Sequence, residues 1–212
     1  MVHFSQNIRW AAEDRGVGAL YHFTWGENLP SILTNGLLSR EDLAHMDIRY
    51  WITDDARWDD TPRAISLSID SINYSMFDAK RNDLRRGWVI LRVEREVLWT
   101  HSCRFCRRNA SSSDIRNNRR FLGGPWGFDT MFKDEVVYIS KTKGYRYRRV
   151  HYEIPKNLPT WNDAEVQVLE PIDRGLITDV IVGDDREKAW VEALGQQIGL
   201  NCVAVIDEFL AR

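Results

Sequence analysis

Residues 141–152 combine two kinds of side chain that suit an unpaired nucleic-acid strand. The segment reads KTKGYRYRRVHY, so cationic residues alternate closely with aromatic ones. Phosphates attract cations, whereas unpaired bases stack on flat aromatic or guanidinium faces. An ordinary solvated basic loop is the alternative, because many charge runs only cover a surface. The candidate nucleic-acid-binding residues here are Tyr145, Arg146, Tyr147, Arg148, Arg149 and His151.

A second basic stretch occupies residues 104–120. It reads RFCRRNASSSDIRNNRR and is rich in arginine, with no lysine and a single acid, Asp114. The formal net charge of the chain is −2, so the protein as a whole does not attract nucleic acid. Any electrostatic attraction must therefore come from local stretches such as these two.

Two single residues are ambiguous by themselves. Glu165 opens an alternating run, AEVQVLEP, which predicts a half-buried β-strand with Glu165 and Gln167 on one face and Ala164, Val166 and Val168 on the other. The pattern alone favours a solvated surface glutamate, and a carboxylate presented to a cleft is the alternative. His22, in YHFT, taken singly is expected to be a satisfied core histidine.

The cysteines raise the question of a metal site. His101, Cys103 and Cys106 in HSCRFC have a spacing that could begin a zinc site. A closed site needs four ligands, and only Cys202 and scattered histidines could complete it. We therefore favour plain thiols and expect no metal. Three cysteines, an odd number, do not form a disulfide framework, so we expect the protein in a reducing cytoplasm.

Length and composition indicate one globular domain over residues 1–212. The chain has 212 residues, 43% of them hydrophobic and 28% charged, which is enough for one sizeable core. No apolar run is long enough to span a membrane, and the first residues lack the apolar middle of a secretory signal. P-loop, GxGxxG and HExxH motifs are missing, which excludes the commonest nucleotide-binding folds but not nucleotide binding itself.

Secondary-structure signals alternate without regular βαβ order. We expect strands at ALYHFT, RAISLSI, GWVILRVE, VVYIS, AEVQVLEP, ITDVIVGD and NCVAVID. We expect helices at SQNIRWAAEDRG, opened by Ser5, at ENLPSILTNG, closed by Gly36, after Ser39 in the capping-box sequence SRED, and at DREKAWVEALGQQIG. Residues 47–62, 101–127 and 141–163 are expected to be irregular. The pattern predicts an α+β domain with a mixed or mostly antiparallel sheet.

Taken in order, several segments resemble the DarT family of DNA ADP-ribosyltransferases. LYHFTWGENLPSILTNGLLSRE resembles the family's opening, and SLSI with NYSMF, WVILRVEREVLW, FCRRNAS and DAEVQVLEPI follow in the family's order. The resemblance covers roughly residues 17–185. The SLSI, NYSMF and FCRRNA elements look closer to the guanosine-directed branch than to the thymidine-directed one.

The resemblance implies a fold, a reaction and partners. The fold would be a split ADP-ribosyltransferase sheet with flanking helices, and NAD would be the ADP-ribose donor, with no metal. The acceptor would be a base in single-stranded DNA, by branch a guanine. The enzyme would be a cytoplasmic toxin of a toxin–antitoxin or phage-defence system, restrained by a macrodomain antitoxin of the DarG type, with no membrane partner.

The resemblance also assigns roles to residues. His22 would contact the NAD ribose with Phe23 and Thr24 beside it, and Tyr74 would stack near nicotinamide. Arg57 would contact NAD phosphates or the acceptor base, although Arg63 lies close enough to compete. Glu165 would be the catalytic carboxylate, able to stabilise an oxocarbenium-like transition state and to accept a proton. Asp163 stands where the family often has an amide, and its part in holding the acceptor base is an open question.

Three alternatives remain at this point. Stacking and phosphate contacts do not separate DNA from RNA, so RNA could be the acceptor. A catalytically inactive single-strand-binding module is a second alternative, which the combination of His22, Arg57 and Glu165 disfavours. A protein-directed transferase is a weaker third.

Overall fold

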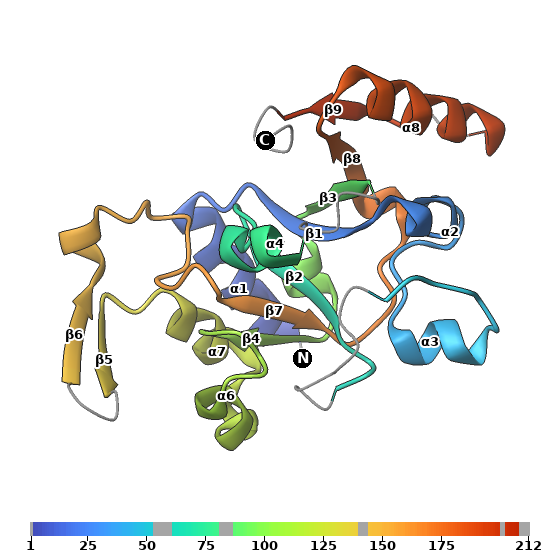
Figure 1. Cartoon of the computed structure of the whole chain (residues 1–212). Helices are drawn as coiled ribbons and strands as arrows, with labels where there is room; N and C mark the ends of the chain where they lie inside the picture. The colour runs from blue at the N-terminus through green and yellow to red at the C-terminus, as the bar shows by residue number, and fades with distance from the viewer. Residues whose placement is uncertain (1, 53–60, 81–86, 140–143, 200–201, 208–212) are drawn as a thin grey trace.

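The sheet at the centre of the molecule contains strands drawn from almost the whole chain. The computed structural model describes residues 2–52, 61–80, 87–139, 144–199 and 202–207. Within these residues, seven strands form one sheet in the order β4-β7-β2-β1-β3-β8-β9 (Figure 1). All neighbours are antiparallel except β8 and β9. The predicted α+β class, with a mixed and mostly antiparallel sheet, is confirmed.

The strands of this sheet are short and, apart from β4, lie close to the predicted segments. Their bounds are β1 Ala19–Trp25, β2 Ile65–Ile69, β3 Trp88–Glu94, β4 Cys103–Cys106, β7 Glu165–Val168, β8 Ile177–Val182 and β9 Ala204–Ile206. A separate two-stranded sheet pairs β5 Glu135–Ile139 with β6 Gly144–Arg148. In Figure 1 this hairpin lies on the left, on the side where β7 begins.

Helices cover the sheet and its ends. The α-helices are α1 Val2–Arg15, α2 Leu29–Asn35, α3 Arg40–His45, α4 Tyr74–Lys80, α5 Val97–Thr100, α6 Ser113–Asn117, α7 Gly124–Met131 and α8 Asp185–Gln197. Short 3₁₀ turns are η1 Gly26–Asn28, η2 Arg119–Phe121, η3 Arg149–Tyr152 and η4 Arg174–Leu176. None of the helices in the described ranges is long and apolar enough to cross a membrane.

The sheet opens between β1 and β2. β1 pairs with β3 along its full length, but with β2 only at Leu20 and Tyr21. Beyond Tyr21 the two strands no longer pair. Instead, Nδ1 of His22 lies 2.9 Å from the carbonyl oxygen of Ser66. The divergence leaves room for a cavity between two strands of one sheet.

β7 lies deeper than an alternating strand should. It pairs with β2 on one side and with β4 on the other, so it is not an edge strand. Val166, Gln167 and Val168 are all buried, and only Glu165 is partly exposed. The prediction of a half-buried strand was wrong, because both faces of β7 are covered after its first residue.

Local signals at two helix ends are confirmed. Gly36 follows α2 with a φ of 81°, and its N–H donates to the carbonyl of Ile32. Ser39 opens α3 with a complete capping box, in which Ser39 and Asp42 each bond the other's backbone N–H. Both residues line the opening between β1 and β2, so local sequence determines part of its wall.

Other expectations are corrected. α1 begins at Val2, which places Ser5 inside the helix rather than at its cap. Residues 101–127 were expected to be irregular but contain β4, α6, η2 and the start of α7. The supposed loop 141–163 contains β6 and η3, because β6 finds a hydrogen-bonding partner in β5.

Candidate active site

The opening between β1 and β2 forms a cavity of about 250 Å³. α2 and α3 close one side, and the segments before β7 and after β4 close the other. The lining includes five residues predicted from the sequence to act in catalysis or binding: His22, Phe23, Thr24, Asp163 and Glu165.

Both carboxylate oxygens of Glu165 are held at the start of β7. The Ser66 hydroxyl donates to Oε1 at 2.5 Å, and the backbone N–H of Ala110 donates to Oε2 at 3.0 Å. Hydrogen bonds to an ionised group are stronger than those between neutral groups. Glu165 is therefore a partly buried, oriented carboxylate at the cavity wall.

His22 is oriented by the same residue. Its Nδ1 atom lies 2.9 Å from the carbonyl oxygen of Ser66, and a carbonyl oxygen can only accept. Nδ1 therefore carries a proton, and in the neutral form of the ring Nε2 is an acceptor. Such a ring can accept a hydrogen bond from a hydroxyl of a bound molecule.

Ser66 thus joins the two residues. Its backbone carbonyl fixes His22 from β1, and its side chain fixes Glu165 from β7, which lies 99 residues further along the chain. A fixed carboxylate and an accepting imidazole share one sheltered cavity. This pair can stabilise positive charge developing on a bound sugar and hold its hydroxyl groups.

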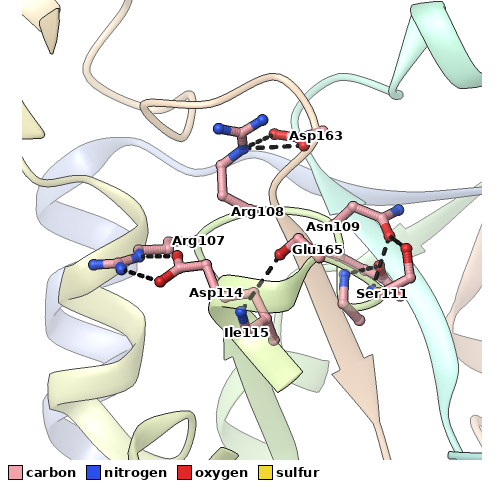
Figure 2. A network of polar contacts seen from close by, with 10 residues as sticks. Arg107, Arg108, Asn109, Ser111, Asp114, Ile115, Asp163 and Glu165 are labelled. Atoms are coloured by element: carbon pink, nitrogen blue, oxygen red, sulfur yellow. Dashed lines mark hydrogen bonds and ion pairs between the residues drawn. The ribbon is translucent and has the colours of Figure 1, made fainter. Parts of the chain in front are cut away.

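The β4–α6 loop, residues 107–112, supports Glu165 from the other side (Figure 2). Oδ1 of Asn109 accepts from both the backbone N–H and the hydroxyl of Ser111, which rigidifies the turn around Ala110. Arg107 makes a two-bonded ion pair with Asp114, at 2.7 and 2.9 Å. The donor to Glu165 is therefore held by contacts on both sides of it.

The same loop holds a second carboxylate. Nε of Arg108 lies 2.8 and 3.0 Å from the two carboxylate oxygens of Asp163 (Figure 2). The Arg108 guanidinium also lies 4.4 Å from the centre of the Trp161 ring. Asp163 is thus fixed at the cavity wall two residues before Glu165.

Thr24 and Asn28 shape the opposite wall. The amide of Asn28 bonds the N–H and the carbonyl of Trp51, at 2.7 and 2.9 Å, and also donates to the Thr24 hydroxyl. Nε1 of Trp25 donates to the carbonyl of Ile52. These contacts keep residues 50–52 against the cavity, directly before the segment that contains Arg57.

One of the predicted NAD contacts, Tyr74, lies away from the cavity. Tyr74 packs beside the buried cluster that contains Trp25, Phe77 and Trp88, and it does not line the cavity. Burial raises the pKa of Tyr74, with the Asp207 carboxylate adding to the effect, so its hydroxyl stays protonated at neutral pH. Phe23 does line the cavity while also packing against Phe77 and Trp88.

Of the two arginines considered for the NAD phosphates or the acceptor base, the structure describes only Arg63. Arg57 lies outside the described residues. Arg63 is highly exposed, pairs with Glu41 at 3.3 Å and does not line the cavity. Among the described lining residues, Arg40 and Lys80 are the cationic side chains.

The aromatic-basic segment divides into two parts. Residues 145–148 lie on β6, paired antiparallel with β5, and His151 lies exposed in η3. Arg149 is buried, and its guanidinium donates to the Thr160 hydroxyl at 3.0 Å and to the Pro155 carbonyl at 2.7 Å. Arg149 therefore holds the chain between η3 and β7 in place rather than offering an exposed cation.

The three cysteines are free thiols in this fold. Burial, helped by the charge of Glu170, raises the pKa of Cys103 to about 12, so this thiol is protonated at neutral pH. Cys106 is buried. In the described part of the chain, no three or more His, Cys, Asp or Glu residues gather as a possible metal site.

Sequence reasoning missed the residues that support the predicted ones. Ser66, Ala110, Arg40 and Arg108 lie in segments that resemble the family, but no role at the site was predicted for them. The ordered motifs were the available signal for these four. Lys80 lies outside those segments, and nothing local indicates it.

Comparison with known proteins identifies the family of the chain. A family model described as "DarT: ssDNA thymidine ADP-ribosyltransferase, DarT" matches residues 21–206, which is most of the chain. The matched region contains His22, Ser66 and Glu165. No curated protein sequence matches the chain significantly.

Solved structures share the fold at low sequence identity. Thermus sp. 2.9 DarT in complex with ADP-ribosylated ssDNA has 13% identity and a TM-score of 0.56, covering 92% of this chain and 96% of that one. The same protein with NAD+ has 11% identity and a TM-score of 0.53, covering 91% and 96%. Thermosipho africanus DarTG with ADP-ribose has 17% identity and a TM-score of 0.54. This chain aligns over 90% of its own length but over only 50% of that protein.

Proposed function

Because the chain belongs to the DarT family of NAD-dependent single-stranded DNA ADP-ribosyltransferases, we propose that it transfers ADP-ribose from NAD to a guanine base in single-stranded DNA. The observation that carries the proposal is the cavity in which Ser66 bonds both His22 and Glu165. An oriented carboxylate and an accepting imidazole suit the ribose whose glycosidic bond breaks.

Glu165 serves two steps of the proposed reaction. As the bond between ribose C1 and the nicotinamide nitrogen breaks, its electron pair stays with nicotinamide, and positive charge develops on the sugar. The fixed carboxylate stabilises that charge. A nitrogen of the base then attacks C1, and the proton that this nitrogen loses passes to Glu165. The products are ADP-ribosylated DNA and nicotinamide.

The remaining lining residues bind the donor. Nε2 of His22 accepts from a ribose hydroxyl, with Phe23 and Thr24 beside it. Arg40 and Lys80 supply positive charge for the pyrophosphate. We also assign Arg57 to the phosphates or the acceptor base, and Tyr74 to the nicotinamide end.

Asp163 supports guanine as the acceptor. Its two oxygens are fixed by Arg108, and each retains a lone pair for a further donor. The Watson–Crick edge of guanine offers two adjacent donors, N1–H and the exocyclic amine. Thymine offers one donor between two carbonyls, which a carboxylate repels. Good two-bonded contacts discriminate bases by about 1–3 kcal/mol.

Thymine is the second candidate, favoured by the family description, which names thymidine. Oligonucleotides that contain a single guanine or a single thymine distinguish the two when incubated with protein and NAD. We expect an added ADP-ribose on the guanine strand, located by fragmentation mass spectrometry. Modification of the thymine strand alone would overturn the guanine assignment and leave the transferase activity standing.

Residues of β6 and η3 are proposed to contact the DNA strand. Tyr145, Arg146, Tyr147 and Arg148 keep this role from their sequence pattern, with His151 beside them. Arg149 is excluded from the set, because its guanidinium is already bonded within the protein. Arg146→Ala combined with Arg148→Ala should lower DNA affinity and flatten its dependence on salt, which binding titrations at several salt concentrations measure.

The same assays address the other acceptors. RNA of matched sequence tests whether RNA is the acceptor. The protein can distinguish RNA from DNA only through a contact that is sensitive to the 2′-hydroxyl. A purely binding module would bind DNA and leave NAD unchanged. The complete support around Glu165 favours an active enzyme over such a module.

We further propose that the enzyme acts in the cytoplasm as a toxin and is restrained by a macrodomain antitoxin of the DarG type. The likeness to a DarTG protein, of which this chain spans about half, supports a partner of that kind. Co-expression with such a macrodomain should restore growth and remove ADP-ribose from cellular DNA. Persistent modification despite the antitoxin would contradict the pairing.

A further inference from the structure

An exposed aromatic cluster lies outside the cavity, where α1, η2 and α7 meet. Phe4, Phe121 and Trp126 are 62%, 60% and 57% exposed. Large aromatic side chains scattered singly on a surface are ordinary, but grouped ones mark interaction sites. These three side chains lie together around the start of α7.

The cluster has a definite geometry. The rings of Phe121 and Trp126 meet edge to face, with their centres 5.8 Å apart. Cδ1 of Phe4 lies 3.9 Å from the point where a side chain on Gly124 would begin. Phe4 and Phe121 therefore both lie beside the N-terminal turn of α7, which carries Trp126.

Cations surround these rings. Lys133 places its ammonium 5.8 Å from the centre of the Trp126 ring. Arg119 and Arg120 precede Phe121 in η2 and are exposed, and residues 115–128 contain no acid. The nearest acids along the chain, Asp114 and Asp129, lie within 4.0 Å of Arg107 and Arg15. The chain around these rings, residues 115–134, therefore carries more cations than acids, four against two.

The cluster adjoins the strand next to Glu165. The carbonyl of Leu122, directly after η2, accepts from the N–H of Phe105 in β4 at 2.7 Å. Cys106, the next residue of β4, is registered opposite Glu165. Neighbouring strands lie about 4.8 Å apart, so the η2 backbone lies on the order of 10 Å beyond β7.

We propose that Phe4, Phe121 and Trp126, with Arg119, Arg120 and Lys133, form a docking surface for the single-stranded DNA that flanks the target base. We refer to these six residues as the α7 surface. The inference rests on the proposed function, because it requires that a DNA strand enters at Glu165. Flat rings bind unpaired bases and the cations bind their phosphates, a combination suited to a single strand of any sequence.

Double-stranded DNA does not suit the α7 surface. Its bases are stacked on one another, so their faces are not available to Phe121 and Trp126. An apolar protein partner would gain little from Arg119, Arg120 and Lys133. The positive charge of these residues complements the phosphates of a nucleic acid, and the exposed rings suit unpaired bases. The α7 surface therefore fits a single-stranded nucleic acid best.

Binding of a fluorescent single-stranded oligonucleotide, without NAD, tests the surface. We expect Phe121→Ala combined with Trp126→Ala to weaken binding roughly 5- to 100-fold. Arg119→Ala combined with Arg120→Ala should reduce the slope of log affinity against log salt by roughly 1.4. The single variant Trp126→Phe keeps an aromatic ring for stacking, so it should bind the oligonucleotide with most of the wild-type affinity.

The matched controls are Trp190→Ala and Arg186→Ala. Both residues are exposed on α8, which Figure 1 places at the opposite end of the molecule from α6 and α7. Neither control should change the affinity or the salt slope. Circular dichroism establishes that each variant is folded, as expected when exposed side chains are shortened.

Transfer assays separate this inference from the proposed function. For a long oligonucleotide the aromatic variants should raise KM with kcat unchanged, and for an acceptor without flanking bases they should change neither. Unaltered affinity and salt slope would overturn the α7 surface, even if the protein transfers ADP-ribose normally. A loss of binding limited to RNA would overturn its assignment to DNA. If the protein modifies no base, the proposed function is wrong, but the binding measurement still shows whether the α7 surface binds single-stranded DNA.

Discussion

Ser66 is the residue on which the proposed catalytic geometry depends. It bonds His22 through its backbone and Glu165 through its side chain. The two contacts can therefore be separated by mutation, since a side-chain change leaves the carbonyl in place. The other oxygen of Glu165 keeps its bond from the Ala110 N–H in such a variant.

Ser66→Ala should lower kcat by roughly 10- to 100-fold. A hydrogen bond to a charged group contributes about 1.5–3 kcal/mol, and its loss lets the carboxylate turn away from the sugar. KM for NAD should change little, because His22 keeps its partner. Ser66→Thr retains the hydroxyl and should recover much of the rate. Steady-state kinetics measure both variants, and an unchanged kcat in Ser66→Ala would show that this contact is dispensable.

Cys103 should make stability depend on alkaline pH. Burial raises the pKa of its thiol from the ordinary value of 9 to about 12. Below pH 9 the thiol is neutral whether the chain is folded or unfolded, and stability is fully present. Between about pH 9 and 12 only the unfolded chain ionises, so stability should fall as pH rises.

Denaturant unfolding across this pH range tests the effect, with Cys103→Ser as the comparison. The wild-type protein should lose more stability than the variant between about pH 9 and 11. Equal losses would show that other groups cause the decline. Alkylation at neutral pH should also be slow at Cys103 until the protein is unfolded.

At the scale of elements, the cavity exists because β1 and β2 separate after two residue pairs. Its walls are then set by elements anchored elsewhere. Oδ1 of Asp70 accepts from the backbone N–H of Ala19, and Oδ2 accepts from Asn157, which ties the segment before β7 to the start of β1. The buried Arg149 guanidinium also holds the segment before β7, through its hydrogen bonds to Pro155 and Thr160.

Gly36→Ala should be strongly destabilising at the end of α2. Gly36 has φ 81° and ψ −174°, a conformation that residues with a side chain rarely adopt, and an added Cβ would lie 2.2 Å from the carbonyl oxygen of Ile172. Backbone strain of this kind costs about 1–3 kcal/mol, and forcing an atom into a packed site costs about 1–3 kcal/mol more. Thermal and urea unfolding measure the loss.

Gly16→Ala is the matched control for this prediction. Gly16 also has a positive φ, 72°, but nothing lies within 4 Å of its added Cβ. It should therefore show the strain without the collision, at about 1–2 kcal/mol. Equal destabilisation of the two variants would show that the contact with Ile172 relaxes at no cost.

At the scale of the whole molecule, NAD should stabilise the fold. The donor would join β1, β2, α2 and α3 across the cavity, and a ligand bound only to the folded state adds about 2.7 kcal/mol at a hundred times its Kd. For a chain of this length, that corresponds to roughly 5 to 10 °C in Tm. Differential scanning fluorimetry with increasing NAD tests the effect. An unchanged Tm at saturating NAD would contradict binding in this cavity.

Sequence alone predicted what local patterns encode. The cap at Gly36, the capping box at Ser39 and most strands follow from short-range propensities, and ordered motifs pointed to His22 and Glu165. Long-range contacts were not predictable in this way. Arg108 meets Asp163 55 residues away, and the burial of Arg149 depends on Thr160 and Pro155 folding over it. Packing, rather than periodicity, decided those positions.

The rate of ADP-ribose transfer from labelled NAD to guanine-containing single-stranded DNA by Glu165→Gln tests the central claim most directly. The substitution keeps the size of the side chain and removes its charge. Glu192→Gln, on the exposed side of α8, is the matched control and should transfer at the wild-type rate. We expect Glu165→Gln to lose at least about a hundredfold in transfer while remaining folded. Transfer at the wild-type rate by Glu165→Gln would contradict the assignment of Glu165 as the catalytic carboxylate.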